Sequence, residues 1–328
     1  MKYKVSIIIP IYNVETYISK CAKSILDQTL TDVEFIFIDD CSVDDSINKL
    51  QEVLISYPAL KSNIKLLHNS KNMGLPSARN IGIKHANGEY IIFSDSDDWI
   101  ERNALFDLYT YAKTNFCDIV YCDYYETYRN HDSYISQDYG TNKINCIKKM
   151  FEGKLHCSTC FKLIKKSLYE NNHIKFVDGA DMFEDVGTTI RLMASASKIG
   201  YIPKAYYHYV QYNTGSIIQT MSHPLKKRIR TLQKIKNIQI ACDFLDKQNI
   251  LEEVRAASNE MKLLAKNDLL ENNSYSLCKW IVTFPESDSA IWKSDNLSLN
   301  LMFLLTWLHC RCLWLYKFQK WITIQFKR

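Results

Sequence analysis

The chain has 328 residues, of which 47% are hydrophobic and 23% charged, so it can bury a large core and is not a disordered protein. Its eleven cysteines, an odd number scattered over many contexts, do not form the disulfide framework of a small secreted protein. The net charge is +5, and residues 296–328 carry five basic side chains and no acidic one. The rest of the chain is therefore neutral, which argues against a nucleic-acid-binding domain.

Five short apolar runs occur in the first 125 residues, and segments with helical spacing separate them. The first run is shorter than the hydrophobic region of a signal peptide and ends at a proline, so we expect a first strand and a cytoplasmic protein. Between the runs, apolar residues recur three and four positions apart, as Ile18, Cys21, Ala22 and Ile25 do. The predicted strands are residues 5–10, 34–38, 64–67, 90–93 and 118–124.

Strands that alternate with helices of this length predict an α/β fold with a mostly parallel central sheet and helices on both faces. Ligands of such sheets bind at the carboxyl ends of the strands. Three polar groups that are far apart in sequence fall on that edge and should meet there. They are Pro10, Tyr12 and Asn13 after the first strand, Asp39 and Asp40 after the second, and Asp95 and Asp97 after the fourth. Asn13 is also a suitable N-cap for the helix that follows it.

The fourth strand ends in three carboxylates, Asp95, Asp97 and Asp98. Neighbouring anions destabilise one another unless a cation or solvent separates them. Side chains at i and i+2 of an extended segment point the same way, so Asp95 and Asp97 can converge on one ion if the chain bends there. Oxygen ligands favour Mg²⁺ or Mn²⁺ over zinc. The alternative is a solvated acidic turn in which Asp98 caps the next helix.

No glycine-rich phosphate loop follows the first strand, because IIIPIYNVE contains neither GxGxxG nor GxxxxGKS/T. A dinucleotide-binding Rossmann domain and a P-loop nucleotidase are both disfavoured, and a metal becomes the candidate for holding phosphates. The pairs Cys157 with Cys160 and Cys310 with Cys312 have no partner pair at zinc spacing, so neither is assigned a metal site.

A second acidic pair, Glu184 and Asp185, precedes a helical pattern in residues 186–194. A helix N-terminus would keep Asp185 ionised, whereas partial burial would raise its basicity. The alternative is that both residues only cap the helix.

Four segments, in this order, resemble the successive signatures of family-2 inverting glycosyltransferases with the GT-A fold. The resemblance covers roughly residues 4–217 and depends on the order and spacing of the segments. It implies a nucleotide-sugar donor, usually a UDP-sugar, whose diphosphate is bridged by Mg²⁺ or Mn²⁺. The segments are SIIIPIYNVETYISKCAKSILDQT, EFIFIDDCSVDDS, NMGLPSARNIG and GEYIIFSDSDD.

The resemblance implies a role for each candidate residue by its position in these motifs. Asp40 would face the uracil with Asp39 behind it, and Arg79 would lie near the diphosphate. These residue types suit the roles, because a carboxylate accepts the imide N–H of uracil and an arginine forms charge-assisted hydrogen bonds to phosphate. The nucleoside site would be lined by Pro10, Tyr12 and Asn13, and the donor and metal site by Asp95, Ser96 and Asp97, with Asp97 the direct metal ligand.

The resemblance further implies that Asp185 is the base that removes the proton from the acceptor hydroxyl, with Glu184 as the second member of the catalytic pair. Inverting transfer is a single displacement at the anomeric carbon, so it requires one base and no protein nucleophile.

Three positions are left open by the resemblance. The aromatic loop AYYHYVQYNTGSI has Val210 and Gln211 where the family often has an arginine, which puts a phosphate contact from this loop in question. His208 is either a metal or diphosphate contact or, more simply, a structural histidine among tyrosines. Lys162 resembles a family lysine ahead of the acceptor segment, and the residues alone give it no role.

We divide the chain into a GT-A domain at 1–224, with a nucleotide half to about 125 and an acceptor half from about 126, a helical extension at 225–295 and a basic tail at 296–328. In the tail, an apolar run is interrupted well short of the ~20 residues that span a membrane. Beyond it, Trp314, Leu315, Phe318, Trp321 and Ile322 share one face of a helix and lysines the other. This pattern predicts peripheral attachment to an anionic membrane surface; the alternative is packing on the catalytic domain or on a partner.

The sequence thus predicts a metal-assisted inverting glycosyltransferase at the cytoplasmic face of the membrane. Its donor would be a nucleotide-sugar, and its acceptor a glycan or a polyprenyl-diphosphate-linked glycan in capsule, exopolysaccharide or lipopolysaccharide synthesis. Two alternatives stay open: a sugar-nucleotide pyrophosphorylase, which should have a glycine-rich loop after its first strand, and a non-catalytic membrane scaffold, which would not need both a metal site and a base.

Overall fold

The computed structural model describes residues 3–213, 224–271 and 277–325. Its described strands form one twisted, mixed sheet in the order β3-β2-β1-β4-β8-β6-β9-β5, with β7 paired to β6. The strands are β1 (Tyr3–Ile11), β2 (Val33–Asp39), β3 (Ile64–His68), β4 (Gly88–Phe93), β5 (Trp99–Ile100), β6 (Ile119–Thr127), β7 (Asp132–Ile135), β8 (Lys162–Lys165) and β9 (Ile199–Val210).

The sheet is mostly parallel, as the sequence predicted. The pairs β1–β2, β1–β4, β2–β3 and β6–β9 are parallel. β8 lies antiparallel between β4 and β6, so β4 and β6 still run in the same direction. All five predicted strands are present. The segment 205–210, which we expected in a loop, is the end of β9, because its residues pair with β5 and β6.

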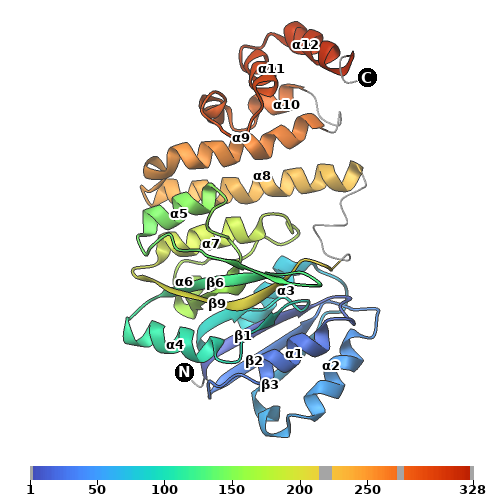
Figure 1. Ribbon diagram of the computed structural model, residues 1–328, viewed down its shortest axis with the longest axis vertical. Helices are drawn as coiled ribbons and strands as arrows, with labels where there is room; N and C mark the ends of the chain where they lie inside the picture. The colour runs from blue at the N-terminus through green and yellow to red at the C-terminus, as the bar shows by residue number, and fades with distance from the viewer. Residues whose placement is uncertain (1–2, 214–223, 272–276, 326–328) are drawn as a thin grey trace.

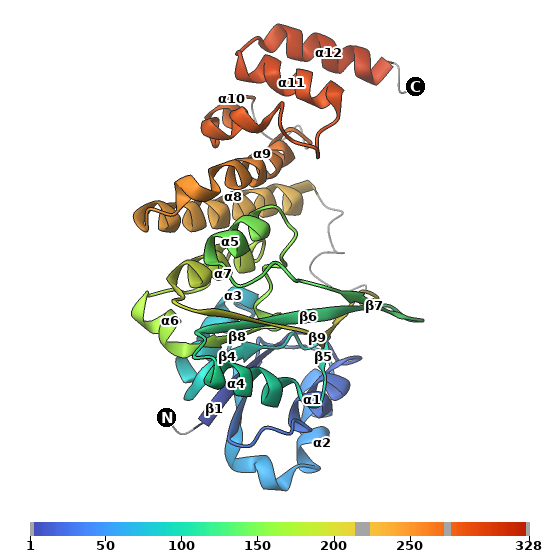
Figure 2. The ribbon, with the colours of Figure 1, turned by 60° about the vertical axis from the view of Figure 1, so that its left-hand side comes forward.

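Seven helices of the described chain accompany the sheet: α1 (Ile18–Leu26), α2 (Ser46–Ile55), α3 (Leu75–His85), α4 (Ala104–Thr114), α5 (Lys143–Phe151), α6 (Lys166–Asn171) and α7 (Glu184–Ser195). Helices α1, α2 and α4 lie on one side of the sheet, and α5 and α7 lie on the other (Figure 2). Short 3₁₀ segments occur at Pro58–Asn63 and Thr159–Phe161. This is the two-sided layering expected for an α/β sheet whose central strands are apolar on both faces.

The C-terminal part is helical and extends away from the sheet, so that the two ends of the chain lie at opposite ends of the molecule (Figure 1). It consists of α8 (Pro224–Lys247), α9 (Arg255–Glu271), α10 (Leu277–Val282), α11 (Leu299–His309) and α12 (Leu313–Gln325), with 3₁₀ segments at Leu251–Val254 and Pro285–Ala290. Among the described residues no helix is both long and apolar enough to cross a membrane.

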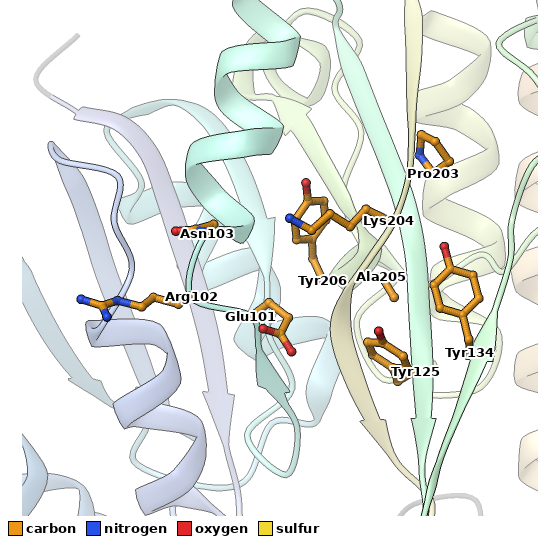
Figure 3. Close-up of a pocket in the computed structure, with 9 residues that line it drawn as sticks. All are labelled: Glu101, Arg102, Asn103, Tyr125, Tyr134, Pro203, Lys204, Ala205 and Tyr206. Carbon is orange, nitrogen blue, oxygen red and sulfur yellow. The ribbon is translucent and has the colours of Figure 1, made fainter.

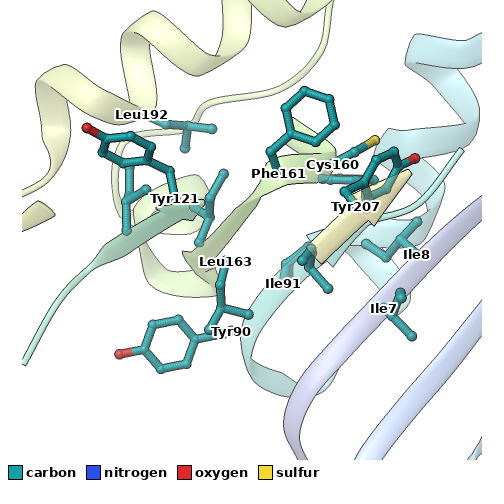
Figure 4. Packing of buried hydrophobic residues seen from close by; sticks show 14 of the residues in the cluster. Ile7, Ile8, Tyr90, Ile91, Tyr121, Cys160, Phe161, Leu163, Leu192 and Tyr207 are labelled. Atoms are coloured by element: carbon teal, nitrogen blue, oxygen red, sulfur yellow. The ribbon is translucent and has the colours of Figure 1, made fainter. Parts of the chain in front are cut away.

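The main core continues across residue 224, where we expected one domain to end. Ile7, Ile8 and Ile91 from the sheet and Phe161 before β8 pack together in its centre (Figure 4). The same buried cluster includes residues of α8 and α9, among them Ile238. A second, smaller cluster joins α9 and α10 to the α11–α12 hairpin. The helical extension therefore belongs to two cores. Helix α8 and part of α9 pack into the main core, and the helices from α9 to α12 form the smaller one.

All eleven cysteines lie in the described part of the chain and are free, as predicted. Burial raises the pKa of the Cys21, Cys122 and Cys157 thiols, to about 12 for Cys122 and for Cys157, so these thiols stay protonated. They act as small core residues.

Candidate active site

The carboxyl ends of β1, β2 and β4 lie side by side at one edge of the sheet. Ile11 is opposite Asp39 in the β1–β2 register. The Asp40 N–H donates to the Ile11 carbonyl over 2.9 Å, and the Ser94 N–H donates to the Ile8 carbonyl over 3.0 Å. The structure therefore brings together the three polar groups that follow these strands.

Asp40 is buried and organises the segment between β3 and α3. Its Oδ1 accepts hydrogen bonds from the Asn69 side chain (2.7 Å) and the Met73 N–H (2.9 Å), and its Oδ2 accepts one from the Gly74 N–H (2.8 Å). Asp39, in the same turn, is also buried. A carboxylate has about four acceptor positions, so Asp40 can accept one further hydrogen bond, and its contact with a uracil stays a proposal.

The residues after β1 differ in accessibility. Pro10 is buried within β1, so it shapes the edge of the sheet instead of lining an open surface, whereas Tyr12 is 46% exposed and Asn13 is exposed. The prediction that Asn13 caps the next helix is wrong, because α1 begins only at Ile18. Asn13 adopts φ 52°, and its Oδ1 accepts a hydrogen bond from the Val43 N–H over 2.9 Å. It joins the loops after β1 and β2.

The turn after β4 exposes part of one carboxylate and buries another. The Asp95 side chain is 31% exposed. Asp98 is buried, and it accepts hydrogen bonds from the Val210 N–H and the Tyr207 hydroxyl, both over 2.7 Å. Asp98 therefore anchors the end of β9 and does not cap α4, which begins at Ala104. Ser96, predicted at the donor site, is also buried.

Arg79 lies beneath the acidic residues and connects them. Its Nη2 donates to Asp95 over 2.9 Å, and its Nη1 donates to Asp185 over 2.9 Å and to Glu184 over 3.2 Å. The Arg79 side chain is only 1% exposed. The guanidinium holds three carboxylates together, Asp95 after β4 and the Glu184–Asp185 pair of α7, and its expected place near the diphosphate stays a prediction. Burial alone would lower the pKa of Arg79, but Asp185 and Asp95 raise it well above its ordinary value.

Burial raises the pKa values of several carboxyl groups in this acidic cluster, which disfavours its fully ionised state. It raises the pKa of Asp97, and the nearby Asp95 charge adds to the increase. Burial, with Asp185 close by, raises the pKa of Glu184 to about 8, so Glu184 is mainly protonated near neutral pH. Burial also raises the pKa of Asp185, and Arg79 opposes this. The cluster would be stabilised by a cation placed beside its carboxylates.

Asp95 and Asp97 could supply the one or two protein ligands that Mg²⁺ and Mn²⁺ need at such a site. Each carboxylate uses one oxygen internally, for Arg79 and for Asn213 respectively. The described residues contain no group of three or more His, Cys, Asp or Glu side chains arranged around a metal. Mg²⁺ usually binds through one or two carboxylates together with substrate phosphates and water, so two available carboxylates suit it better than a preformed cage would.

Several contacts in this site were not predicted. The Asn213 side chain donates to Asp97 over 2.8 Å, and the Thr159 hydroxyl donates to Asp185 over 3.3 Å. The Asp95 N–H donates to the Tyr207 hydroxyl over 3.0 Å. These residues come from the segments before β8 and at the end of β9, where the sequence has no local motif that indicates them.

Lys162 has a clear structural role. Its ammonium group is fully buried and donates to the carbonyls of His156 and Ser158, both over 2.7 Å. Burial lowers the pKa of Lys162. Lys162 thus fixes the segment that leads to Thr159, one of the partners of Asp185.

Val210 and Gln211 stand where the family often has an arginine, but an arginine from another part of the chain lies next to the segment after β9. The Arg129 guanidinium, from the β6–β7 connection, lies 5.6 Å from the centroid of the Tyr212 ring. The Tyr212 ring is 6.1 Å from that of Tyr17 and precedes Asn213, the partner of Asp97. Arg129 is exposed and therefore accessible to an anion.

His208 is a structural histidine. Its ring stacks on Trp99 and Tyr125, with centroids 4.9 and 4.8 Å away, and its Nε2 lies 2.9 Å from Glu101. Because side chains alternate along a strand, His208 and Tyr207 lie on opposite faces of the sheet. A cavity of about 340 Å³ lies on the His208 side and contains none of the predicted site residues. Its lining residues are Glu101, Arg102, Asn103, Tyr125, Tyr134, Pro203, Lys204, Ala205 and Tyr206 (Figure 3).

The mixed sheet, its order and the flanking helices define a GT-A fold. The crystal structure of Staphylococcus aureus TarS residues 1–349 with UDP-GlcNAc superposes with a TM-score of 0.62 at 20% identity, over 98% of this chain and 92% of that one. The glycosyl transferase family 2 model matches residues 6–172. The chain belongs to this family and is a glycosyltransferase.

Curated relatives agree with this assignment. Glycosyltransferase GlyG of Streptococcus pneumoniae is 32% identical over 232 residues, which are 67% of this chain and 74% of GlyG. The poly(ribitol-phosphate) beta-glucosyltransferase of Bacillus spizizenii is 30% identical over 261 residues, which are 75% of this chain but 38% of that larger enzyme. The similarity therefore extends beyond the GT-A domain into the helical region.

Proposed function

We propose that this glycosyltransferase inverts the anomeric centre of a UDP-sugar while transferring the sugar to a hydroxyl of a surface glycan, with Mg²⁺ or Mn²⁺ bound at Asp95 and Asp97. One observation carries the proposal: Arg79 links Asp95, in the turn after β4, directly to Asp185 of α7. A metal site for a leaving diphosphate and a candidate base are thus held by one buried guanidinium.

Asp185 is suited to accept the proton of the attacking hydroxyl. Its Oδ1 accepts from Arg79 and Thr159, and within the described part of the chain its Oδ2 accepts no hydrogen bond. The Asp185 side chain is 19% exposed, so an acceptor can approach it. Glu184, mainly protonated near neutral pH, lies beside Asp185 without adding a full charge. The proton therefore moves from the acceptor hydroxyl to Oδ2 of Asp185.

On the donor side, a bound divalent cation would supply positive charge for the diphosphate that leaves. Asp95 and Asp97 would hold that cation, Arg79 keeps Asp95 in place, and Asn213 orients Asp97. Arg129 supplies a second positive charge on the outer side of the site. Electrostatic groups that are fixed before reaction stabilise developing charge without a reorganisation cost.

The relatives indicate the class of acceptor. The Bacillus spizizenii enzyme is named for glucosyl transfer to poly(ribitol-phosphate), and TarP of Staphylococcus aureus for N-acetylglucosaminyl transfer to the same polymer. TarS has been crystallised with UDP-GlcNAc and with UDP. These names support a UDP-hexose or UDP-N-acetylhexosamine as donor and a bacterial surface polymer, or its lipid-linked precursor, as acceptor.

A panel of nucleotide-sugars tests this function. UDP-glucose, UDP-galactose, UDP-GlcNAc, UDP-GalNAc and GDP-mannose are incubated with the protein, with Mn²⁺ or with EDTA, and release of the nucleoside diphosphate is measured. We expect slow hydrolysis of one UDP-sugar that depends on Mn²⁺. Preference for GDP-mannose would overturn the UDP assignment, and equal hydrolysis in EDTA would overturn the metal.

We also propose that the α11–α12 hairpin contacts an anionic membrane. Trp314, Phe318 and Trp321 are 69%, 56% and 58% exposed, and they lie at i, i+4 and i+7 on the outer face of α12. Leu299 and Phe303 are exposed on α11. The inner face of α12 packs on α11 through Tyr316, so the aromatic face has no partner among the described residues. Residues 296–328 carry only positive charge, which complements anionic lipid.

Replacing Trp314, Phe318 and Trp321 together by serine should abolish sedimentation with vesicles that contain phosphatidylglycerol, while nucleotide binding is retained. Phe116→Ser is the matched control, because Phe116 is an exposed phenylalanine of the catalytic domain, 83% exposed. The parent protein should sediment and be partly released by high salt. Equal sedimentation of the triple variant and the parent would contradict the membrane contact.

A further inference from the structure

The segment between α6 and α7 ends in the candidate catalytic pair and is held from two sides. On one side, α3 donates from Ser77 to the Asp178 carboxylate over 2.8 Å and from Asn80 to the Phe176 carbonyl over 2.9 Å. Arg79, which binds Asp185, lies between these two residues of α3. Helix α3 therefore fixes both this side of the segment and the guanidinium that joins the acidic cluster.

On the other side, two side chains of α8 donate to backbone carbonyls of the same segment. Asn237 donates from Nδ2 to the carbonyls of Met182 (2.8 Å) and Ala180 (3.2 Å), and Gln233, one turn earlier, donates from Nε2 to the Gly179 carbonyl over 2.9 Å. We call Gln233 and Asn237 the carbonyl clamp. Asn237 is fully buried, whereas the Gln233 bond is exposed, so we expect most of the effect from Asn237.

The backbone next to the clamp is strained. Phe183, between Met182 and the catalytic pair, has φ 59°, a left-handed conformation that a phenylalanine rarely adopts. It occupies the N-cap position of α7 and makes no side-chain capping bond. Without external support, this residue would relax and turn Glu184 and Asp185 away from Arg79. The clamp holds the carbonyl immediately before it.

The fit between α7 and α8 leaves no room for adjustment. A Cβ at Gly187 would lie 2.7 Å from Oδ1 of Asn237. That Oδ1 is buried and has no hydrogen-bond partner in the described part of the chain, which is unfavourable for a carboxamide. Asn237 thus uses both of its donor bonds for the segment before α7 while its acceptor is unsatisfied. This arrangement suits a residue placed for positioning and not for stability.

We propose that the carbonyl clamp of α8 is a positioning device for the catalytic pair, so that the helical region after residue 224 is required for turnover. The proposal rests on the proposed function, in which Asp185 is the base. Asn237 acts through the backbone of Met182 and Phe183, and it does not touch the reacting groups. A displacement of about 1 Å at a base can lower a rate by about 10²-fold, which is the effect that loss of the clamp would produce.

The test is a double-mutant cycle with Mn²⁺-dependent UDP release from the UDP-sugar selected by the panel, and water as acceptor. Asn237→Ala should lower turnover about 10- to 100-fold and leave UDP affinity within about twofold. In an Asp185→Asn background the same change should have little further effect, since the base that it positions is gone. Gln239→Ala is the control, because Gln239 lies on α8 and its side chain bonds, within the described part of the chain, only Asp243 of the same helix.

Gly187→Ala provides a second route to the same displacement if Asn237→Ala does not fold. Its methyl group would press on the Asn237 carboxamide, and the cycle with Asp185→Asn is repeated. The clamp proposal would be overturned if the change lowered turnover equally in the parent and in the Asp185→Asn background. It would also be overturned if neither Asn237→Ala nor Gly187→Ala lowered turnover in the parent. Full turnover of Asp185→Asn itself would overturn the proposed base instead, so the two failures are distinguishable.

Discussion

Asp97→Ala should abolish sugar transfer and remove metal-dependent UDP binding. The Asp97 carboxylate is half-buried next to Asp95, and burial together with the Asp95 charge raises its pKa, so a cation bound beside it would stabilise its ionised form. Without Asp97, the proposed cation, which would offset the charge of the leaving diphosphate, would lose a ligand. UDP affinity is measured by titration calorimetry with Mn²⁺ and with EDTA, and the parent should show a large difference between the two that the variant lacks.

The matched control is Glu52→Ala, which removes an exposed carboxylate of α2 far from the acidic cluster. It should leave both measurements unchanged. Normal transfer by Asp97→Ala at ordinary Mn²⁺ concentration would contradict the assigned metal site, whatever its effect on folding.

Asp185→Asn should lower turnover by about 10² to 10⁴, the usual contribution of a general base, with UDP affinity nearly intact. Asparagine can still accept the hydrogen bonds of Arg79 and Thr159 through its side-chain oxygen, but it cannot accept a proton. Thermal unfolding is measured alongside, because Arg79 loses the charge of one partner. Loss of UDP binding in this variant would mean that Asp185 is structural and that the base lies elsewhere.

Glu184→Gln is the comparison for this prediction. The pKa of Glu184 is raised to about 8, so near neutral pH a neutral amide replaces a mainly neutral acid. Its effect on turnover should be less than about tenfold. The parent's turnover should also fall on acidification, because a base works only in its ionised form. Since burial raises the pKa of Asp185, that fall should occur above the range of an ordinary aspartate.

The two predictions depend on a shortage of positive charge in the cluster. One guanidinium contacts three carboxylates, and Asp97 lies nearby without a cationic partner among its described contacts. Removing a single partner from a buried charge network costs more than the pair contributes, because it leaves an uncompensated charge. The donor and its metal would supply the missing charge, which connects donor binding to the position of Asp185 through Arg79.

The sequence by itself determined the five N-terminal strands, their direction and the placement of their polar ends on one edge. These features are local. An apolar run of four to six residues predicts a buried strand, and two neighbouring strands joined by a crossover helix run parallel. The candidate acidic pairs Asp95 with Asp97 and Glu184 with Asp185 were predicted for the same reason, since the members of each lie within two positions of one another and follow or begin a regular element.

Tertiary structure alone decided which side chains meet across these elements. The Arg79 guanidinium is buried and joins Asp95, after β4, to Glu184 and Asp185 of α7, which lie about 90 positions further along the chain. Asp98 anchors β9 instead of capping α4. The hydrogen bonds from Asn237 to the segment before α7 join residues more than 50 positions apart, and no sequence periodicity predicts such a contact. Local pattern therefore predicted the candidate catalytic groups, whereas long-range packing determined which of these side chains contact one another.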